Sequence, residues 1–221
     1  MAVTTSEPYR RSVVAPDNHL LHKIHSLTGI IPIGLFLVQH LTLNSFAFAG
    51  KAQFNAVIRF FNEIMPHHLF FLMEWGIIFV PLLFHGLYGL LITTHGSANI
   101  TPYNYLRNWM YVLQRVSGVI LVAYIGYHVY TTTFAARVHG LETIYYDAMA
   151  ERLANPWIAL IYLAGITSAT FHLANGVWNF AIRWGLVLSA RSQQVFGHIC
   201  LGLFAVLTAW GWFAFYAFRM H

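Results

Sequence analysis

Five long apolar segments constrain this chain more than any other feature, because each of them can cross a lipid bilayer as a helix. A bilayer core of about 30 Å requires about 20 predominantly apolar residues in helical form. The segments lie at about 26–46, 70–93, 109–134, 156–183 and 196–218. We therefore predict an all-α membrane protein with five transmembrane helices, which we number I to V in chain order.

The composition supports a single membrane domain that comprises residues 1–221. Only 9% of the residues are charged, whereas soluble domains contain about 25%. The apolar segments follow one another too closely for a soluble domain between them, and no period marks an internal repeat. Residues 1–21 lack the apolar core of a signal peptide, so we expect a polar segment ahead of a retained helix I.

Two of the loops carry apolar residues at helical spacing. Phe54, Val57 and Ile58 follow this pattern within residues 44–69, and residues 138–153 form a similar segment. We expect both loops to form short helices that lie in the membrane interface.

The distribution of Lys and Arg predicts the orientation of the chain. With five helices, the N-terminus shares one side with the II–III and IV–V loops, and that side carries seven basic residues: Arg10, Arg11, Lys23, Arg107, Arg115, Arg183 and Arg191. The opposite side carries five: Lys51, Arg59, Arg137, Arg152 and Arg219. Cytoplasmic loops are enriched in Lys and Arg, so the N-terminus is predicted to be cytoplasmic. Because the net charge of +5 is spread over helix ends and loops, it does not indicate a nucleic-acid partner.

Four of the apolar segments are interrupted by a histidine. These residues are His40, His85, His128 and His172, one in each of helices I to IV. A single buried histidine is most often a hydrogen-bonded packing residue. Ionisable side chains are costly in hydrocarbon and usually face the bundle interior with a partner, so four of them indicate a shared function.

Depth in the membrane groups the four histidines into two layers. Counted from the expected cytoplasmic helix ends at about 1.5 Å per residue, they lie roughly 12 Å (His85), 16 Å (His172), 21 Å (His40) and 27 Å (His128) deep. The inner layer therefore holds His85 and His172, and the outer layer holds His40 and His128.

Two facing histidines at one depth are the ligand set of a six-coordinate b-type haem. A zinc or copper site would normally gather three or four ligands at one level. The chain has one cysteine, Cys200, and no C-x-x-C-H motif, so the haems would be held noncovalently. The pattern thus predicts two noncovalent b haems.

Glycines near the inner histidines fit this interpretation. Gly89 and Gly176 each lie four residues after their histidine, where they could leave room for a porphyrin edge. Close helix packing is the alternative explanation, and it accounts equally well for the other glycines of these helices: Gly29, Gly34, Gly118 and Gly165.

Further polar residues are candidates for haem propionates and for a quinone. A propionate needs a cation or a hydroxyl donor near a surface. The candidates for the inner haem are Arg115, Ser117, Arg183 and His25. Arg115 could instead be an arginine that snorkels to the interface. The candidates for a quinone head group near the outer surface are Gln39, Asn44 and Glu74, for which a helix-cap or interface role is the alternative.

Two haems in layers would form a transmembrane electron path, which requires a donor and an acceptor. The chain contains neither a dinucleotide fingerprint nor a set of cysteines for an iron–sulfur cluster. We therefore expect the soluble redox chemistry on another subunit and a lipid-soluble quinone as the other partner.

Ordered motifs in four helices resemble one known family. They are HSLTGIIPIGLFLVQHL from His25, FVPLLFHGLYG, YNYLRNWMYVLQRVSGVI ahead of His128, ATFHLANGVWNFAIRWG, and RSQ from Arg191. From about His22 to about Ser192 the chain resembles the diheme cytochrome b subunit of succinate:quinone oxidoreductases.

The resemblance implies a membrane anchor in a bacterial cytoplasmic membrane. It implies partner subunits at the cytoplasmic face, a flavoprotein with covalent FAD and an iron–sulfur protein, and menaquinone as the membrane partner. It assigns the proximal haem to His85 and His172 and the distal haem to His40 and His128, with the quinone near the distal haem. The anchor would carry electrons without acting on succinate itself.

One residue departs from part of that family. Diheme fumarate reductases that couple proton and electron transfer carry a glutamate two positions before the helix IV histidine, where Thr170 stands here. The departure resembles the succinate-oxidising members and favours succinate oxidation.

Two other interpretations remain at this point. The chain could be the quinone-reactive cytochrome b subunit of a hydrogenase, formate dehydrogenase or nitrate reductase. It could also be a transporter whose histidines relay protons or bind a metal ion. A transporter would be expected to show interrupted helices in matching halves, whereas Pro32 and Pro81 do not occupy equivalent positions.

Overall fold

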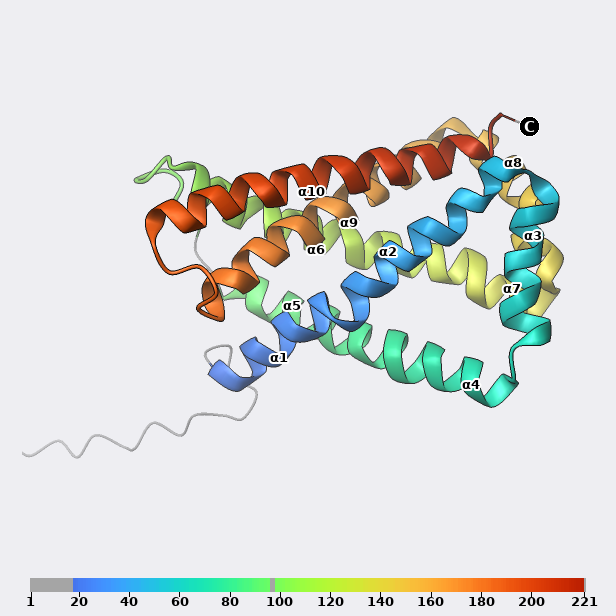
Figure 1. The fold of residues 1–221 in the computed structure, drawn as a ribbon, viewed down its shortest axis with the longest axis horizontal. Coiled ribbons are helices and arrows are strands. Elements are labelled where there is room, and N and C mark those ends of the chain that lie inside the picture. Colours follow the sequence, from blue (N-terminus) through green and yellow to red (C-terminus); the bar gives the residue numbers. More distant parts are fainter. Residues whose placement is uncertain (1–17, 96–97, 221) are drawn as a thin grey trace, which may run out of the picture.

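The computed structural model describes residues 18–95 and 98–220, and these residues form an elongated bundle of helices without strands (Figure 1). Five of the helices are long and apolar enough to cross a membrane. The structure therefore confirms the predicted all-α class with five transmembrane helices. We call them spans I to V.

The spans are built from the following elements. Span I (His19–Ala49) contains α1 (His19–Ile30), α2 (Pro32–Asn44) and the 3₁₀-helix η1 (Ser45–Ala49). Span II (His67–Thr94) contains α4 (His67–Phe71), the π-helix η3 (Leu72–Phe79) and α5 (Val80–Thr94). Span III (Leu106–His139) contains α6 (Leu106–Val129), the π-helix η4 (Tyr130–Phe134) and α7 (Ala135–His139). Spans IV and V are the single helices α9 (Pro156–Arg183) and α10 (Ala190–Ala217).

Span I begins earlier than the apolar pattern indicates, at His19 rather than near residue 26. The reason is a helix cap, because the Asn18 side chain accepts hydrogen bonds from the main-chain N–H groups of Leu20 and Leu21. The last residues of the predicted polar segment 1–21 are therefore helical. Residues 1–17, which include Arg10 and Arg11, lie outside the described residues.

Prolines account for the two irregular places in spans I and II. Proline has no N–H group and its ring clashes with the preceding helical turn. Span I is interrupted at Ile31, directly before Pro32. In span II, the π-helical stretch Leu72–Phe79 directly precedes the turn that contains Pro81, where a wider helical turn accommodates the ring.

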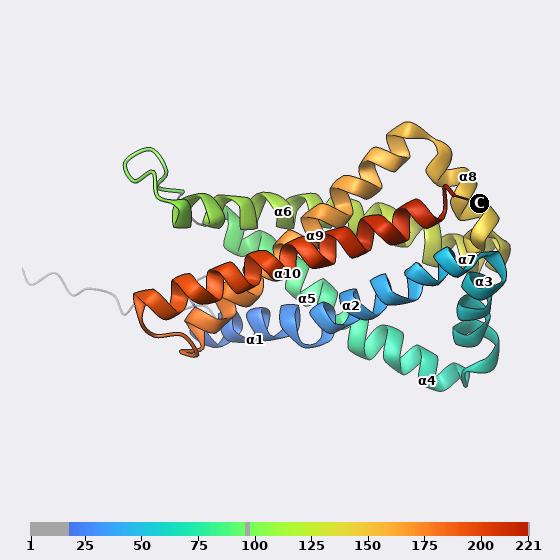
Figure 2. The ribbon, with the colours of Figure 1, turned by 45° about the horizontal axis from the view of Figure 1, so that its top comes forward.

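Spans I to IV form a closed ring of four helices. α1 contacts α5, α5 contacts α6, α6 contacts α9, and α9 contacts α1 again. α10 lies outside this ring and packs along α9 and α2 (Figures 1 and 2). The arrangement is a four-helix bundle with a fifth helix on its outside, as the sequence predicted.

The two ends of the bundle differ. The start of α1, residues 98–105 and the loop 184–189 lie at one end, which we call the N-terminal end, and α3, α8 and the end of α10 lie at the other (Figure 1). We call the second end the cap end. α3 (Lys51–Arg59) and α8 (Tyr146–Ala154) are the short helices predicted in the two loops.

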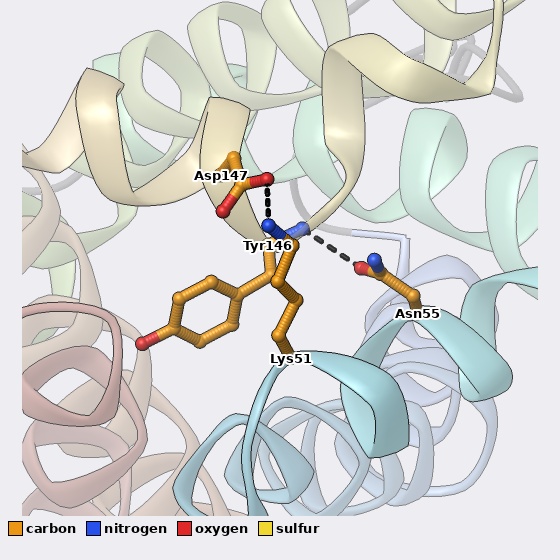
Figure 3. Close-up of polar contacts among 4 residues, drawn as sticks. All are labelled: Lys51, Asn55, Tyr146 and Asp147. Carbon is orange, nitrogen blue, oxygen red and sulfur yellow. Dashed lines mark hydrogen bonds and ion pairs between the residues drawn. The ribbon is translucent and has the colours of Figure 1, made fainter. Parts of the chain in front are cut away.

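The main buried cluster lies at the cap end. It contains Phe54 of α3, Leu153 of α8 and Phe215 of α10, and Tyr124 and Ile166 pack against it. The side chains of Lys51 in α3 and Asp147 in α8 form an ion pair that joins the two loop helices (Figure 3). The cap end therefore has a buried apolar cluster of its own.

Candidate paired-histidine site

The histidines of spans II and IV face each other inside the bundle. His85 of α5 and His172 of α9 have ring centroids 6.1 Å apart, and their ring planes are almost perpendicular, at 83°. His85 lies inside the α-helical stretch Val80–Thr94, so its ring is carried on a regular helix. We call these two residues the N-terminal pair.

The histidines of spans I and III form a second facing pair. His40 of α2 and His128 of α6 have ring centroids 5.8 Å apart and an interplanar angle of 83°. We call them the cap pair. The structure therefore brings together the same two couples that were grouped by depth.

The N-terminal pair is held at Nδ1 by main-chain carbonyl groups. His85 Nδ1 lies 2.9 Å from the carbonyl oxygen of His25, and His172 Nδ1 lies 3.1 Å from that of Gln114. The Ser117 hydroxyl oxygen is also 3.1 Å from His172 Nδ1. These contacts orient both rings and leave Nε2 as the nitrogen for a further ligand.

An amide network surrounds His172. Gln114 Nε2 donates to the His172 carbonyl oxygen at 3.1 Å, and Asn175 Nδ2 donates to Gln114 Oε1 at 2.7 Å. Asn175 and Ser117 are both buried. The network ties α6 to α9 at the level of the N-terminal pair.

The cap pair has a different environment, which is built from aromatic side chains. His128 Nδ1 lies 3.4 Å from the Tyr162 hydroxyl oxygen. The Tyr124 ring stacks on His128 with centroids 5.8 Å apart, and the Phe36 ring lies 5.4 Å from that of His40. Asn44 donates from Nδ2 to the His40 carbonyl oxygen at 2.8 Å, so this amide holds the main chain of span I.

The ring separation within each pair is compatible with two imidazoles that share one metal ion. Two metal–imidazole bonds of about 2.0 Å, on opposite sides of the metal, place the ring centres about 6 Å apart. The observed separations of 5.8 Å and 6.1 Å agree with this value. Within residues 18–95 and 98–220, no cluster of three or more His, Cys, Asp or Glu side chains could hold a metal ion. The zinc or copper alternative therefore gains no support from the described residues.

Two of the predicted propionate residues carry buried nitrogens without a hydrogen-bond partner in the described structure. These atoms are His25 Nε2 and Arg115 Nε. The His25 ring stacks on that of His85, with centroids 4.0 Å apart and planes at 7°. The Arg115 guanidinium lies 3.5 Å from the centre of the Tyr111 ring. A buried donor without a partner fits an anionic group such as a propionate.

The other two propionate candidates have protein partners. Ser117 contacts His172 Nδ1, and Arg183 Nη1 lies 3.2 Å from His22 Nδ1 at the exposed end of α9. Arg183 thereby joins span IV to the start of span I. Ser117 is placed to orient a histidine, a role that the sequence did not suggest.

The three quinone candidates lie in different surroundings. Gln39 lines a groove of about 410 Å³ between spans I and II, together with Ile31, Phe36 and Met73. Glu74 is buried and forms an ion pair with Arg137 of span III. The Asn44 side-chain amide donates a hydrogen bond to the His40 carbonyl oxygen. Of these three residues, Gln39 faces the groove.

The glycines that face the imidazole rings are not the two that the sequence indicated. A Cβ atom at Gly89 would lie 3.1 Å from His25 Nε2, and one at Gly176 would lie 3.6 Å from Gln114 Nε2. These two glycines therefore face protein side chains, and their role in haem clearance stays a prediction. Gly29 and Gly118, which helix packing also explained, face the imidazoles: a Cβ would lie 2.9 Å from His85 Nδ1 and 3.1 Å from His172 Cε1, respectively.

Thr170 points away from the histidines, toward span V. It is completely buried, and its hydroxyl oxygen lies 2.7 Å from that of Thr208 in α10. It also donates to the Ile166 carbonyl oxygen at 3.0 Å. The residue thus helps to join α9 to α10.

Sequence reasoning missed Gln114, Tyr162 and the role of Gly29. Each contacts a histidine from a neighbouring helix, so spacing within one helix gives no signal for it. Gln114 was visible as a polar residue inside span III three residues before Ser117, and a polar residue at that depth is a reason to search for a partner.

Comparison with known proteins gives a consistent result. Residues 92–211 match the profile of a family described as the succinate dehydrogenase/fumarate reductase transmembrane subunit. The chain is also 39% identical over 196 residues to the succinate dehydrogenase cytochrome b558 subunit of Bacillus subtilis (strain 168), an alignment that covers 89% of this chain and 95% of that relative.

Proposed function

The chain belongs to the family of succinate dehydrogenase/fumarate reductase transmembrane subunits, and from this membership we propose that it is the diheme cytochrome b anchor of a succinate:menaquinone oxidoreductase. That it is a cytochrome b membrane subunit of this enzyme class follows from the family and the relative. The same comparisons favour this class over a hydrogenase, formate dehydrogenase or nitrate reductase subunit and over a transporter.

Two b haems are proposed, one at each histidine pair. The observation that carries this proposal is the presence of two perpendicular imidazole pairs with centroids about 6 Å apart, each joining two different spans. When bound, each haem would take up and release one electron. The four histidines would hold the irons, and the spacing of the pairs along the bundle would order the two haems across the membrane.

The contacts at Nδ1 support Nε2 ligation. A histidine that binds metal through Nε2 usually donates from Nδ1–H to a carbonyl group or another acceptor, which fixes the tautomer. His85 and His172 have carbonyl acceptors at 2.9 Å and 3.1 Å. His128 has the Tyr162 hydroxyl oxygen at 3.4 Å.

Arg115 and His25 are the proposed propionate partners at the N-terminal pair. Both contribute a buried nitrogen that has no other partner in the described structure. Arg183 is a weaker candidate because it is exposed and contacts His22. Ser117 is proposed as an orienting residue of His172 rather than as a propionate donor.

The groove between spans I and II is the proposed quinone site. Its wall is mostly apolar, as a quinone ring and isoprenoid tail require, and Gln39 provides an amide that can bind a quinone carbonyl. Phe36 lines the groove and also contacts the His40 ring, so a bound quinone would lie close to the cap pair. Glu74 is proposed to act as the partner of Arg137, outside this site.

The partner subunits are proposed to bind at the N-terminal end of the bundle. They are a flavoprotein that carries FAD and an iron–sulfur protein, on the cytoplasmic side of a bacterial membrane. The sequence supports this orientation, because seven Lys and Arg residues fall on that side and five on the other. Haem, FAD and the iron–sulfur clusters would together connect succinate with menaquinone.

Purification of the assembled complex tests the proposal. We expect two b haems per anchor chain by the pyridine haemochrome method and a copurifying subunit with covalent flavin. Succinate should reduce menaquinone analogues, and Gln39→Ala should raise the KM for the quinone with both haems retained. A single haem would refute the diheme proposal, and the absence of a flavin subunit would refute the proposed partners.

A further inference from the structure

Among the described residues of span IV, Tyr162 makes a polar contact with the cap pair. Its hydroxyl oxygen lies 3.4 Å from His128 Nδ1, and the two rings meet edge to face with centroids 5.7 Å apart. In the N-terminal pair, main-chain carbonyl groups lie at Nδ1 of both histidines, and the Ser117 hydroxyl group adds a contact at His172. His128 thus has a side-chain oxygen at Nδ1, whereas both histidines of the N-terminal pair have a backbone oxygen there.

The position of Tyr162 is fixed on all sides. Its side chain is only 5% exposed, and its ring packs edge to face on Tyr124 and Tyr127, with centroids 5.6 Å and 6.5 Å away. The Arg152 guanidinium and the Thr131 hydroxyl lie beside its phenol group. A phenol with this little freedom can impose an orientation on the imidazole that it contacts.

The cap supports Tyr162 from the outside. Tyr162 belongs to the buried cluster that also contains Tyr146, Leu153 and Phe218. The Tyr146 main-chain N–H donates to Asn55 Oδ1 at 2.9 Å (Figure 3). The Tyr146 hydroxyl group donates to the Ala217 carbonyl oxygen at 2.8 Å. These bonds tie α8 to α3 and to the end of α10, directly over the cluster.

We propose that Tyr162 is a positioning residue for the haem that His40 and His128 would bind, with the cap as its support; this inference rests on the proposed diheme function. The Nδ1–H group of His128 donates to the phenol oxygen. This bond fixes the tautomer and the rotation of the imidazole ring.

The proposal has a direct electronic consequence. A hydrogen-bond acceptor at Nδ1–H makes the imidazole a stronger electron donor to the iron. Stronger donation stabilises the ferric state relative to the ferrous state. Removal of the phenol oxygen therefore shifts the reduction potential of the cap-end haem to a more positive value. The other haem, whose histidines are held by carbonyl groups, keeps its potential.

The test uses Tyr162→Phe in the complete complex, with Tyr127→Phe as the matched control. Tyr127 contacts the same tyrosine cluster, and the described structure shows no hydrogen bond between its hydroxyl group and His128. Redox titration and low-temperature EPR resolve the two haems. We expect Tyr162→Phe to retain both haems and to shift the potential and the g values of one of them, whereas Tyr127→Phe shifts neither.

Two haems per chain with unchanged potentials and g values in Tyr162→Phe would overturn the role of Tyr162 and leave the diheme proposal intact. Fewer than two haems in the unmodified complex would instead overturn the diheme proposal. If Tyr162→Phe does not assemble, 3-fluorotyrosine at position 162 replaces it, because it weakens the phenol oxygen as an acceptor without a change in packing. It should shift the same haem in the same direction by a smaller amount, and no shift would overturn the inference.

Discussion

The N-terminal pair and the cap pair have nearly the same internal geometry but are held by different chemistry. His85 and His172 are fixed by carbonyl oxygens and an amide network, with Gly29 against the His85 ring. His128 is fixed by a tyrosine that belongs to the buried cluster under the cap. Backbone acceptors persist through most substitutions, whereas a phenol is lost with one. The comparison indicates that the backbone of the bundle sets the ring orientation in the N-terminal pair. In the cap pair, the packing of the cap around Tyr162 sets the orientation of the His128 ring.

Replacement of a single histidine should have the largest effect. We expect His85→Ala and His172→Ala to remove the same haem, and His40→Ala and His128→Ala to remove the other one. The physical reason is that a six-coordinate haem without one imidazole loses half of its axial ligation. Haem content and the EPR signals of each variant complex measure the result. Loss of different haems in His85→Ala and His172→Ala would contradict the pairing.

A methyl group at Gly29 should disturb the N-terminal pair alone. Gly29→Ala would place a Cβ atom 2.9 Å from His85 Nδ1, and we expect destabilisation of about 1–3 kcal/mol as in other overpacked interiors. Gly86→Ala is the matched control, since no atom lies within 4 Å of a Cβ there. Thermal loss of haem absorbance in detergent compares the two. Equal behaviour of both variants would show that Gly29 does not limit the space beside His85.

The Glu74–Arg137 pair should stabilise the cap end without a role in quinone turnover. The Glu74 side chain is 9% exposed and that of Arg137 is 40% exposed. We therefore expect a coupling of about 1–2 kcal/mol, below the 3–5 kcal/mol lost when a fully buried pair is broken. A double-mutant cycle of Glu74→Gln and Arg137→Gln, measured by thermal unfolding, provides the value. An increase in the KM for quinone in Glu74→Gln, with unchanged stability, would instead favour a quinone role.

Removal of the Ser117 hydroxyl group should have the smallest effect. The Gln114 carbonyl oxygen lies 3.1 Å from His172 Nδ1 and is part of the backbone, so the ring keeps an acceptor in Ser117→Ala. We therefore expect the free energy of unfolding to fall by about 1 kcal/mol or less. In redox titration, the reduction potential of the haem at the N-terminal pair should shift by less than that of the cap-end haem shifts in Tyr162→Phe. A larger change would contradict the contrast between backbone and side-chain support.

The fold could be predicted because it follows from the length and polarity of the segments. The grouping of His85 with His172 and of His40 with His128 followed from the rise per residue of a helix, which fixes depth along the axis. The start of span I is also encoded in the sequence, because Asn18 is a favourable N-cap residue.

Rotation about the helix axes could not be predicted, and it decides which side chains meet. Tyr162 is 34 residues from His128, and Glu74 is 63 residues from Arg137. Such contacts depend on how neighbouring helices turn their faces, which spacing within one helix does not determine. For the same reason the predicted clearance residue Gly89 faces His25, while Gly29 faces His85.

The most direct test of the account is an electron cryomicroscopy map of the purified complex at a resolution that shows axial ligands. We expect two haems inside the ring of spans I to IV, with one iron between the Nε2 atoms of His85 and His172 and the other between those of His40 and His128. An iron bound by histidines from different pairs, or by any other residue, would contradict the account.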